Sequence, residues 1–193
     1  MHLHSATDPR GALVLGHGAG GGVGAPDLVA VTEVAPAEGF AVALVEQPYR
    51  VAGRRSSPPA KQLDAAWLAV IDGLRAGELS DLPLIPGGRS AGARVACRTA
   101  AEAGAVAVLC LAFPLQPPRR RTASEDPPSR LHELDSVAVP TLVVQGERDR
   151  FGMPPPGPHR EVVRVPGDHS LRADVAAVAE AVRGWLARSG PAR

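Results

Sequence analysis

The chain has 193 residues, a length that fits one domain built around one hydrophobic core. Its 21 Lys and Arg residues nearly balance its 20 Asp and Glu residues, so the charge gives no indication of a nucleic-acid or membrane partner. No apolar run approaches membrane-spanning length, and the N-terminus lacks the basic-then-apolar pattern of a signal peptide. We therefore expect a soluble, cytoplasmic protein.

Strands and helices are predicted to alternate along the chain, which favours a doubly wound, mostly parallel α/β sheet with helices on both faces. All of residues 1–193 are expected to form one domain, in which residues 1–10 are a flexible tail. The metal-like spacing of His2 and His4 would then carry no meaning. Six strands are predicted at 12–15, 40–45, 82–85, 106–111, 141–145 and 161–165, in the sheet order 2-1-3-4-5-6, and the clearest helices at 27–35, 63–74, 91–103 and 171–185.

A glycine-rich loop follows the first strand and has two interpretations. Gly16, Gly18 and Gly21 satisfy the dinucleotide pattern G-x-G-x-x-G, and Glu46 ends the second strand, where a ribose-binding acid is expected. Against this, the loop continues through residues 23–26 before a helix begins, so a phosphate would not meet the helix N-terminus directly. Alternatively, glycines allow the main chain to approach a reacting carbonyl closely.

Two long segments interrupt the alternation, one at 47–61 and one at 114–129. Both follow predicted strands, so both are expected at the same rim of the sheet. The proline content of the second segment predicts disorder. Arginines in these segments could attract an anionic substrate, although loop arginines are usually just solvated: Arg50, Arg54, Arg55 and Arg119 to Arg121.

A nucleophile elbow is predicted between the third strand and the helix that follows it. Residues 88–92 read Gly-Arg-Ser-Ala-Gly, which satisfies G-x-S-x-G. Gly88 and Gly92 are needed because side chains at those positions would collide in so sharp a turn. Ser90 alone would be an ordinary helix N-cap, so the pattern gains weight only if an acid and a histidine follow.

An acid and a histidine do follow, each directly after a predicted strand. Asp149 comes after the fifth strand and His169 after the sixth. Binding sites in open parallel sheets lie at these strand ends, and the order Ser, Asp, His is that of the α/β-hydrolases. Glu147 competes with Asp149 as the acid but is expected to face solvent, and Asp168 is expected to form a turn.

With these motifs in place, the chain resembles the α/β-hydrolase family, in particular the short, capless bacterial members near dienelactone hydrolase. The resemblance implies that Ser90 is the nucleophile, His169 the general base and acid, and Asp149 the orienting carboxylate. Dienelactone hydrolase itself has a cysteine in place of the serine, so its substrate does not carry over. The motifs that carry the resemblance are residues 16–21, 87–92, 145–152 and 167–171.

The same resemblance assigns the glycine-rich loop to the oxyanion site. Backbone N–H groups of Ala19 and Ala91 would stabilise the tetrahedral oxyanion. Gly18 and Gly20 would shape the loop, and His17 would either support it or fill the space beneath it.

The expected function is therefore acyl transfer from a small-molecule carboxylic ester or thioester to water, with no cofactor and no metal. Cys97 and Cys110 are expected to be buried apolar residues rather than a disulfide or metal pair. Two alternatives stay open: a non-catalytic binding or scaffold protein with a hydrolase-like fold, and a dinucleotide-binding protein.

Overall fold

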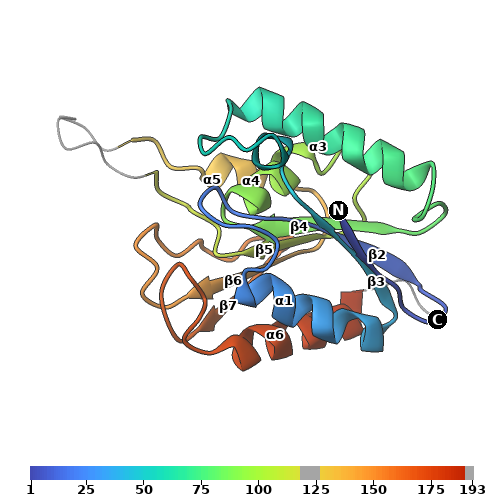
Figure 1. Ribbon diagram of the computed structural model, residues 1–193. Helices are drawn as coiled ribbons and strands as arrows, with labels where there is room; N and C mark the ends of the chain where they lie inside the picture. Colours follow the sequence, from blue (N-terminus) through green and yellow to red (C-terminus); the bar gives the residue numbers. More distant parts are fainter. Residues whose placement is uncertain (118–126, 190–193) are drawn as a thin grey trace.

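The computed structural model describes residues 1–117 and 127–189. Its centre is a seven-stranded sheet in the order β1-β3-β2-β4-β5-β6-β7, parallel except for β1 (Figure 1). The strands are β1 His2–His4, β2 Gly11–Gly16, β3 Phe40–Val45, β4 Leu84–Arg89, β5 Val108–Leu111, β6 Thr141–Gly146 and β7 Arg160–Val165.

Helices cover both faces of this sheet. Figure 1 shows α3, α4 and α5 on one face and α1 with α6 on the other, which is the doubly wound arrangement predicted from the sequence. The helices are α1 Pro26–Val34, the 3₁₀ turn η1 Ala35–Glu38, α2 Pro48–Val51, α3 Ala60–Arg75, α4 Ala91–Thr99, α5 Leu131–Asp135 and α6 Val175–Ser189.

The central strands are continuous apolar runs because both of their faces are covered. All six residues of β2 are buried, and so are all six of β3. On one face, Trp67 and Ile71 of α3 pack into the core; on the other, Val182 and Trp185 of α6 do the same. The helical spacing of these residues is what the sequence showed as an apolar stripe.

The sheet order agrees with the prediction for six strands, and part of the segment that was expected to be a flexible tail, residues 1–10, belongs to the sheet. His2–His4 forms a seventh strand that pairs antiparallel with β3, placing His2 opposite Leu44 and His4 opposite Val42. The added strand pairs the backbone groups that β3 would otherwise leave exposed at the edge of the sheet.

Several observed element boundaries also differ from the predicted ones. The strand predicted at 82–85 runs on through its glycines to Arg89, and the helix predicted at 91–103 ends at Thr99. The last helix begins at Val175 rather than Leu171, because Leu171 has a φ of +51°, which is incompatible with a helix.

The structure describes one of the two interrupting segments in full and the other only in part. The segment at 47–61 contains the short helix α2. Most of the segment at 114–129, including Arg119 to Arg121, lies outside the described residues. Within 1–117 and 127–189, no helix is both long enough and apolar enough to cross a bilayer.

Candidate active site

Ser90 sits on a strained turn between β4 and α4. Its φ of +52° and ψ of −107° lie outside the regions that residues with a Cβ normally adopt. The turn is possible because glycines flank it: a Cβ at Gly88 would lie 2.2 Å from the carbonyl oxygen of Gly16, and a Cβ at Gly92 2.3 Å from the same atom. The backbone around Ser90 is therefore packed directly against β2.

The structure brings Ser90, His169 and Asp149 together in one hydrogen-bonded chain. His169 Nδ1 lies 2.7 Å from Asp149 Oδ2, and His169 Nε2 lies 2.9 Å from Ser90 Oγ. The Asp149 side chain is fully buried, whereas the imidazole is 19% exposed. A buried carboxylate at Nδ1 favours the tautomer in which Nδ1–H donates to Asp149 and Nε2 accepts from the serine hydroxyl.

Two neighbours that the sequence did not single out hold Asp149. The amide Nε2 of buried Gln145 donates to Asp149 Oδ2, and the backbone N–H of Phe151 donates to Oδ1, each over 2.8 Å. The Phe151 ring also meets the His169 ring edge-on, with 4.5 Å between centroids. The two hydrogen bonds hold the Asp149 carboxylate in place, and the ring contact restricts the orientation of the imidazole.

The two competing acids lie apart from this chain. Glu147 is exposed, as expected. Asp168 accepts hydrogen bonds from the hydroxyl and the backbone N–H of Ser170, which hold the pKa of Asp168 below its usual value and make it a turn former.

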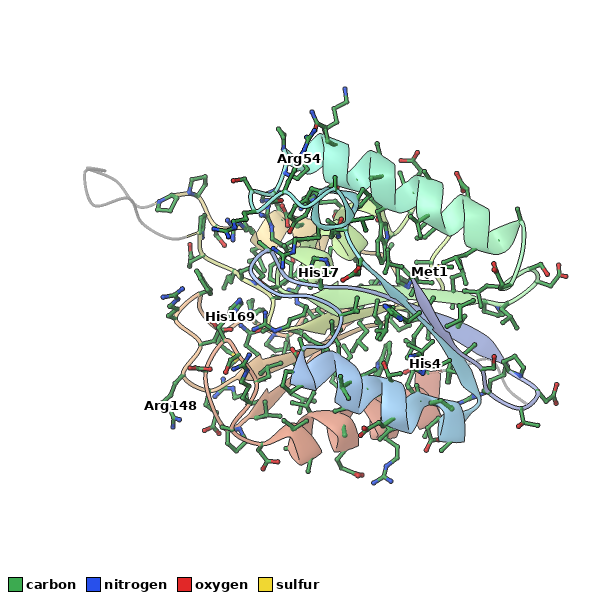
Figure 2. The ribbon with its side chains drawn as sticks, viewed as in Figure 1. Met1, His4, His17, Arg54, Arg148 and His169 are labelled. Atoms are coloured by element: carbon green, nitrogen blue, oxygen red, sulfur yellow. The ribbon has the colours of Figure 1, made fainter. Side chains whose placement is uncertain are left out.

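The glycine-rich loop reaches the elbow from the end of β2. Gly18 packs so closely that a Cβ there would lie 2.9 Å from Arg89 Nη1 and 3.3 Å from Ser90 Cβ. His17 is buried beneath the loop: its Nδ1–H donates to the carbonyl of Gly18, and its Nε2 accepts from the backbone N–H of Gln47. His17 thus ties the loop to the end of β3, and Figure 2 shows it near the same end of the sheet as His169.

An open cavity of about 700 Å³ lies over these groups. Ala19 and Gly20 of the loop line it together with Ser90 and His169, while Ala91 begins α4 beside them. Three arginines that were not predicted as site residues also line the cavity: Arg89, Arg150 and Arg172. Within the described residues, no carboxylate lines it.

The arginines of the segment at 47–61 lie away from this cavity. Arg54 lines a separate hollow between α2 and α3, and neither Arg50 nor Arg55 lines the cavity over Ser90. The cavity arginines could have been suspected from the sequence, because each of them lies within three residues of a candidate triad residue.

Arg89 forms an ion pair with Asp27 of α1, which is the first residue of the helix predicted at 27–35. Arg89 Nε lies 3.0 Å from Asp27 Oδ2, and the aspartate is fully buried. Burial raises the pKa of Asp27 above its usual value, and the positive charge of Arg89 offsets only part of that effect.

Other candidate ligands are scattered. His2 and His4 lie on β1, and His132 on the exposed surface of α5. Cys97 and Cys110 are buried free thiols whose sulfur atoms lie 3.4 Å apart. In the part of the chain that the structure describes, no three His, Cys, Asp or Glu side chains gather in a group that could hold a metal ion.

Comparison with known proteins agrees with the fold. Residues 9–176 match the family model described as an alpha/beta hydrolase domain, while the comparison with curated proteins finds no match. A dienelactone hydrolase from Anabaena variabilis superposes with a TM-score of 0.75 and 20% identity, covering 98% of this chain and 91% of that one.

Two further solved structures are similar at the same low level of identity. Est1E from Butyrivibrio proteoclasticus with bound ferulic acid has a TM-score of 0.74 and 17% identity, covering 97% of this chain and 94% of that one. A serine hydrolase without a lid from Xanthomonas campestris has a TM-score of 0.71 and 18% identity, covering 99% and 89%. At these identities the likeness concerns the fold alone.

Proposed function

Because this chain belongs to the alpha/beta hydrolase domain family, we propose that it is a serine hydrolase that transfers the acyl group of a carboxylic ester or thioester to water. One observation carries the proposal. The hydroxyl of Ser90, the imidazole of His169 and the carboxylate of Asp149 form a continuous hydrogen-bonded chain beneath an open cavity. Such a chain activates a serine for attack on a carbonyl.

In this mechanism Ser90 Oγ attacks the carbonyl carbon while His169 Nε2 takes the hydroxyl proton. Asp149 holds the imidazole in the required tautomer and stabilises its positive charge. Backbone N–H groups of Ala19 and Ala91 stabilise the oxyanion, an effect that typically lowers the barrier by about 3–4 kcal/mol per donor. His169 then protonates the leaving alcohol or thiol, and water, deprotonated in turn by His169, releases the acyl group from Ser90.

The cavity favours a small-molecule substrate that carries a negative group. Arg150 and Arg172 line it, and no ion pair within the described residues joins either of them to a carboxylate. Two guanidinium groups in a partly enclosed site attract anions. Est1E, whose fold is similar, binds ferulic acid, a carboxylic acid, and this supports an anionic group on the substrate.

A fluorophosphonate probe tests the proposal without knowledge of the substrate. We expect covalent labelling of the wild-type protein and none of Ser90→Ala at the same concentration, because the probe reacts with an activated serine. A folded wild-type sample that resists labelling would support the alternative of a hydrolase-like scaffold. A panel of esters and thioesters, neutral and anionic, then identifies the acyl and leaving groups.

A further inference from the structure

Arg89 occupies the position directly before the nucleophile and contacts three separate parts of the site. Its Nε pairs with Asp27 of α1 at 3.0 Å, and its Nη2 donates to the backbone carbonyl of His169 over 2.9 Å. Its Nη1 faces Gly18, where a Cβ would lie only 2.9 Å away. One guanidinium group therefore joins α1, the glycine-rich loop and the loop that carries the imidazole.

The anchor of this group is rigid. Asp27 is fully buried in the first turn of α1, where its Oδ1 accepts a hydrogen bond from the backbone N–H of Leu28. Arg89 itself ends β4, a strand paired with neighbours on both sides, and its side chain is 17% exposed. Both ends of the ion pair are thus attached to regular elements, whereas His169 sits in a loop after β7.

We propose that Arg89 is a positioning residue of the acyl-transfer reaction, a role that rests on the proposed hydrolase function. The guanidinium group, fixed by Asp27, holds the main chain of His169 so that the imidazole stays within reach of the serine hydroxyl. It acts through His169 and takes no part in proton transfer. A loop displaced by about 1 Å is enough to lower a rate by about 100-fold.

The planar fork of arginine suits this task better than other cations. Two of its nitrogen atoms point in different directions, toward the carboxylate of Asp27 and the carbonyl of His169. A lysine ammonium in the same place is a single point charge and can reach only one of them well. The two contacts also occupy the guanidinium group, which distinguishes Arg89 from Arg150 and Arg172, the other two arginines that line the cavity.

The test compares Arg89→Met with Arg98→Met as a matched control. Arg98 lies on α4, is 18% exposed and forms an ion pair with Asp64, but it contacts no part of the His169 loop. Both substitutions remove a mostly buried, paired arginine, so both should lower the melting temperature. Only Arg89→Met should slow fluorophosphonate labelling, by about 10–100-fold.

Three further measurements separate positioning from a structural or a binding role. With an ester substrate, Arg89→Met should lower kcat by about 10–100-fold and change KM by less than about 3-fold. Arg89→Lys should recover part of the rate, and Asp27→Asn should lose part of it. The low-field proton resonance of His169 Nδ1–H, hydrogen-bonded to Asp149, should be sharp in the wild type and broadened in Arg89→Met.

The outcomes distinguish this inference from the proposed function. No labelling of the folded wild type means that the hydrolase function fails. Wild-type labelling that Arg89→Met matches, or a loss confined to KM, overturns the positioning role while leaving the hydrolase intact. If Arg89→Met does not fold, Arg89→Lys decides: a labelling rate equal to that of the wild type overturns the inference, and a reduced rate with a sharp melting transition supports it.

Discussion

Two arginine–carboxylate groups lie on opposite faces of the sheet. The arginines of both groups belong to β4 or to α4, the helix that follows it. On the α1 face, Arg89 pairs with Asp27. On the α5 face, Arg94 and Arg98 both pair with buried Glu133. Arg98 also forms a bidentate ion pair with Asp64 of α3. The chemistry is the same in both groups, but their electrostatics differ.

The pKa values of the two buried carboxyl groups show the difference. Burial by itself raises the pKa of both. For Glu133, hydrogen bonds and charge from Arg94 and Arg98 exceed that effect, so its pKa falls below 4.5. For Asp27, burial prevails, its pKa stays above 3.8, and Oδ2 accepts no hydrogen bond of ordinary geometry from any described residue.

Ion pairs of similar burial therefore have different roles in this protein. The Glu133 group is fully paired, and its arginines hold α3, α4 and α5 together. In the Asp27 pair one carboxylate oxygen accepts no hydrogen bond from the described residues, and the Arg89 guanidinium donates its hydrogen bond to the main chain of His169 instead. We therefore expect substitutions in the Glu133 group to lower stability, and substitutions around Ser90 to lower the rate of the reaction.

The largest effect is expected for Ser90→Ala. Removal of the hydroxyl should lower ester hydrolysis by about 10³–10⁶-fold, because no other step can form the acyl intermediate. The melting temperature, measured by calorimetry, should stay close to that of the wild type, since the strained backbone conformation is unchanged. A variant that hydrolyses esters at the wild-type rate would show that Ser90 is not the nucleophile.

Glu133→Ala should act in the opposite way. It leaves two arginines without their shared partner and should lower the free energy of unfolding by about 2–4 kcal/mol, less than a fully enclosed pair because Arg94 is 25% exposed. Denaturant titration measures this change, and the labelling rate of the folded variant should not move. Asp135→Asn is the control on the same helix: its carboxylate is 56% exposed, so its loss should cost below about 1 kcal/mol.

The pH dependence of stability should also have opposite signs at the two carboxyl groups. The lowered pKa of Glu133 stabilises the fold above pH 4.5, and that contribution is lost as the pH falls through its folded-state pKa. The raised pKa of Asp27 does the reverse: its contribution is greatest in acid and declines as the pH rises from 3.8 through the folded-state value.

Urea titrations across this pH range test both signs. Relative to the wild type, Glu133→Gln should become less destabilised as the solution is acidified. Asp27→Asn should become relatively more stable as the pH rises. The same sign for both variants would contradict the comparison.

The smallest effect is expected at the arginines that have no carboxylate partner among the described residues. Arg172→Gln should raise KM for an anionic ester by about 3–10-fold and leave KM for its neutral analogue unchanged, because one partly exposed charge interacts weakly with a ligand. Rising ionic strength should reduce the difference between the two esters in the wild type. Equal KM values for both esters at every salt concentration would remove the preference for anions.

Much of the architecture was predictable because its signals are local. Apolar runs marked the strands, and glycines two residues on either side of Ser90 marked the elbow. Asp149 and His169 followed from their places after strands. The catalytic roles of these residues stay predictions, but their side chains lie together, as expected for residues that follow parallel strands of one sheet.

What the sequence could not show depends on partners that are distant along the chain. The strand at His2–His4 has no periodic signal of its own and exists because β3 offers it an edge. Asp27 looked like a helix-start residue until the fold brought Arg89 beside it. Gln145 looked like an ordinary strand residue, although its side chain donates to Asp149.

The contact between the elbow glycines and Gly16 has a counterpart on the side of the site that carries the imidazole. The serine is mounted on main chain that has no room to shift against β2, and the main chain just before His169 lies equally close to β6, where a Cβ at Gly146 would be 2.4 Å from the carbonyl oxygen of Asp168. The nucleophile and the base are therefore each set directly against a strand of the sheet. On warming, hydrolysis and the fold should be lost over the same temperature range.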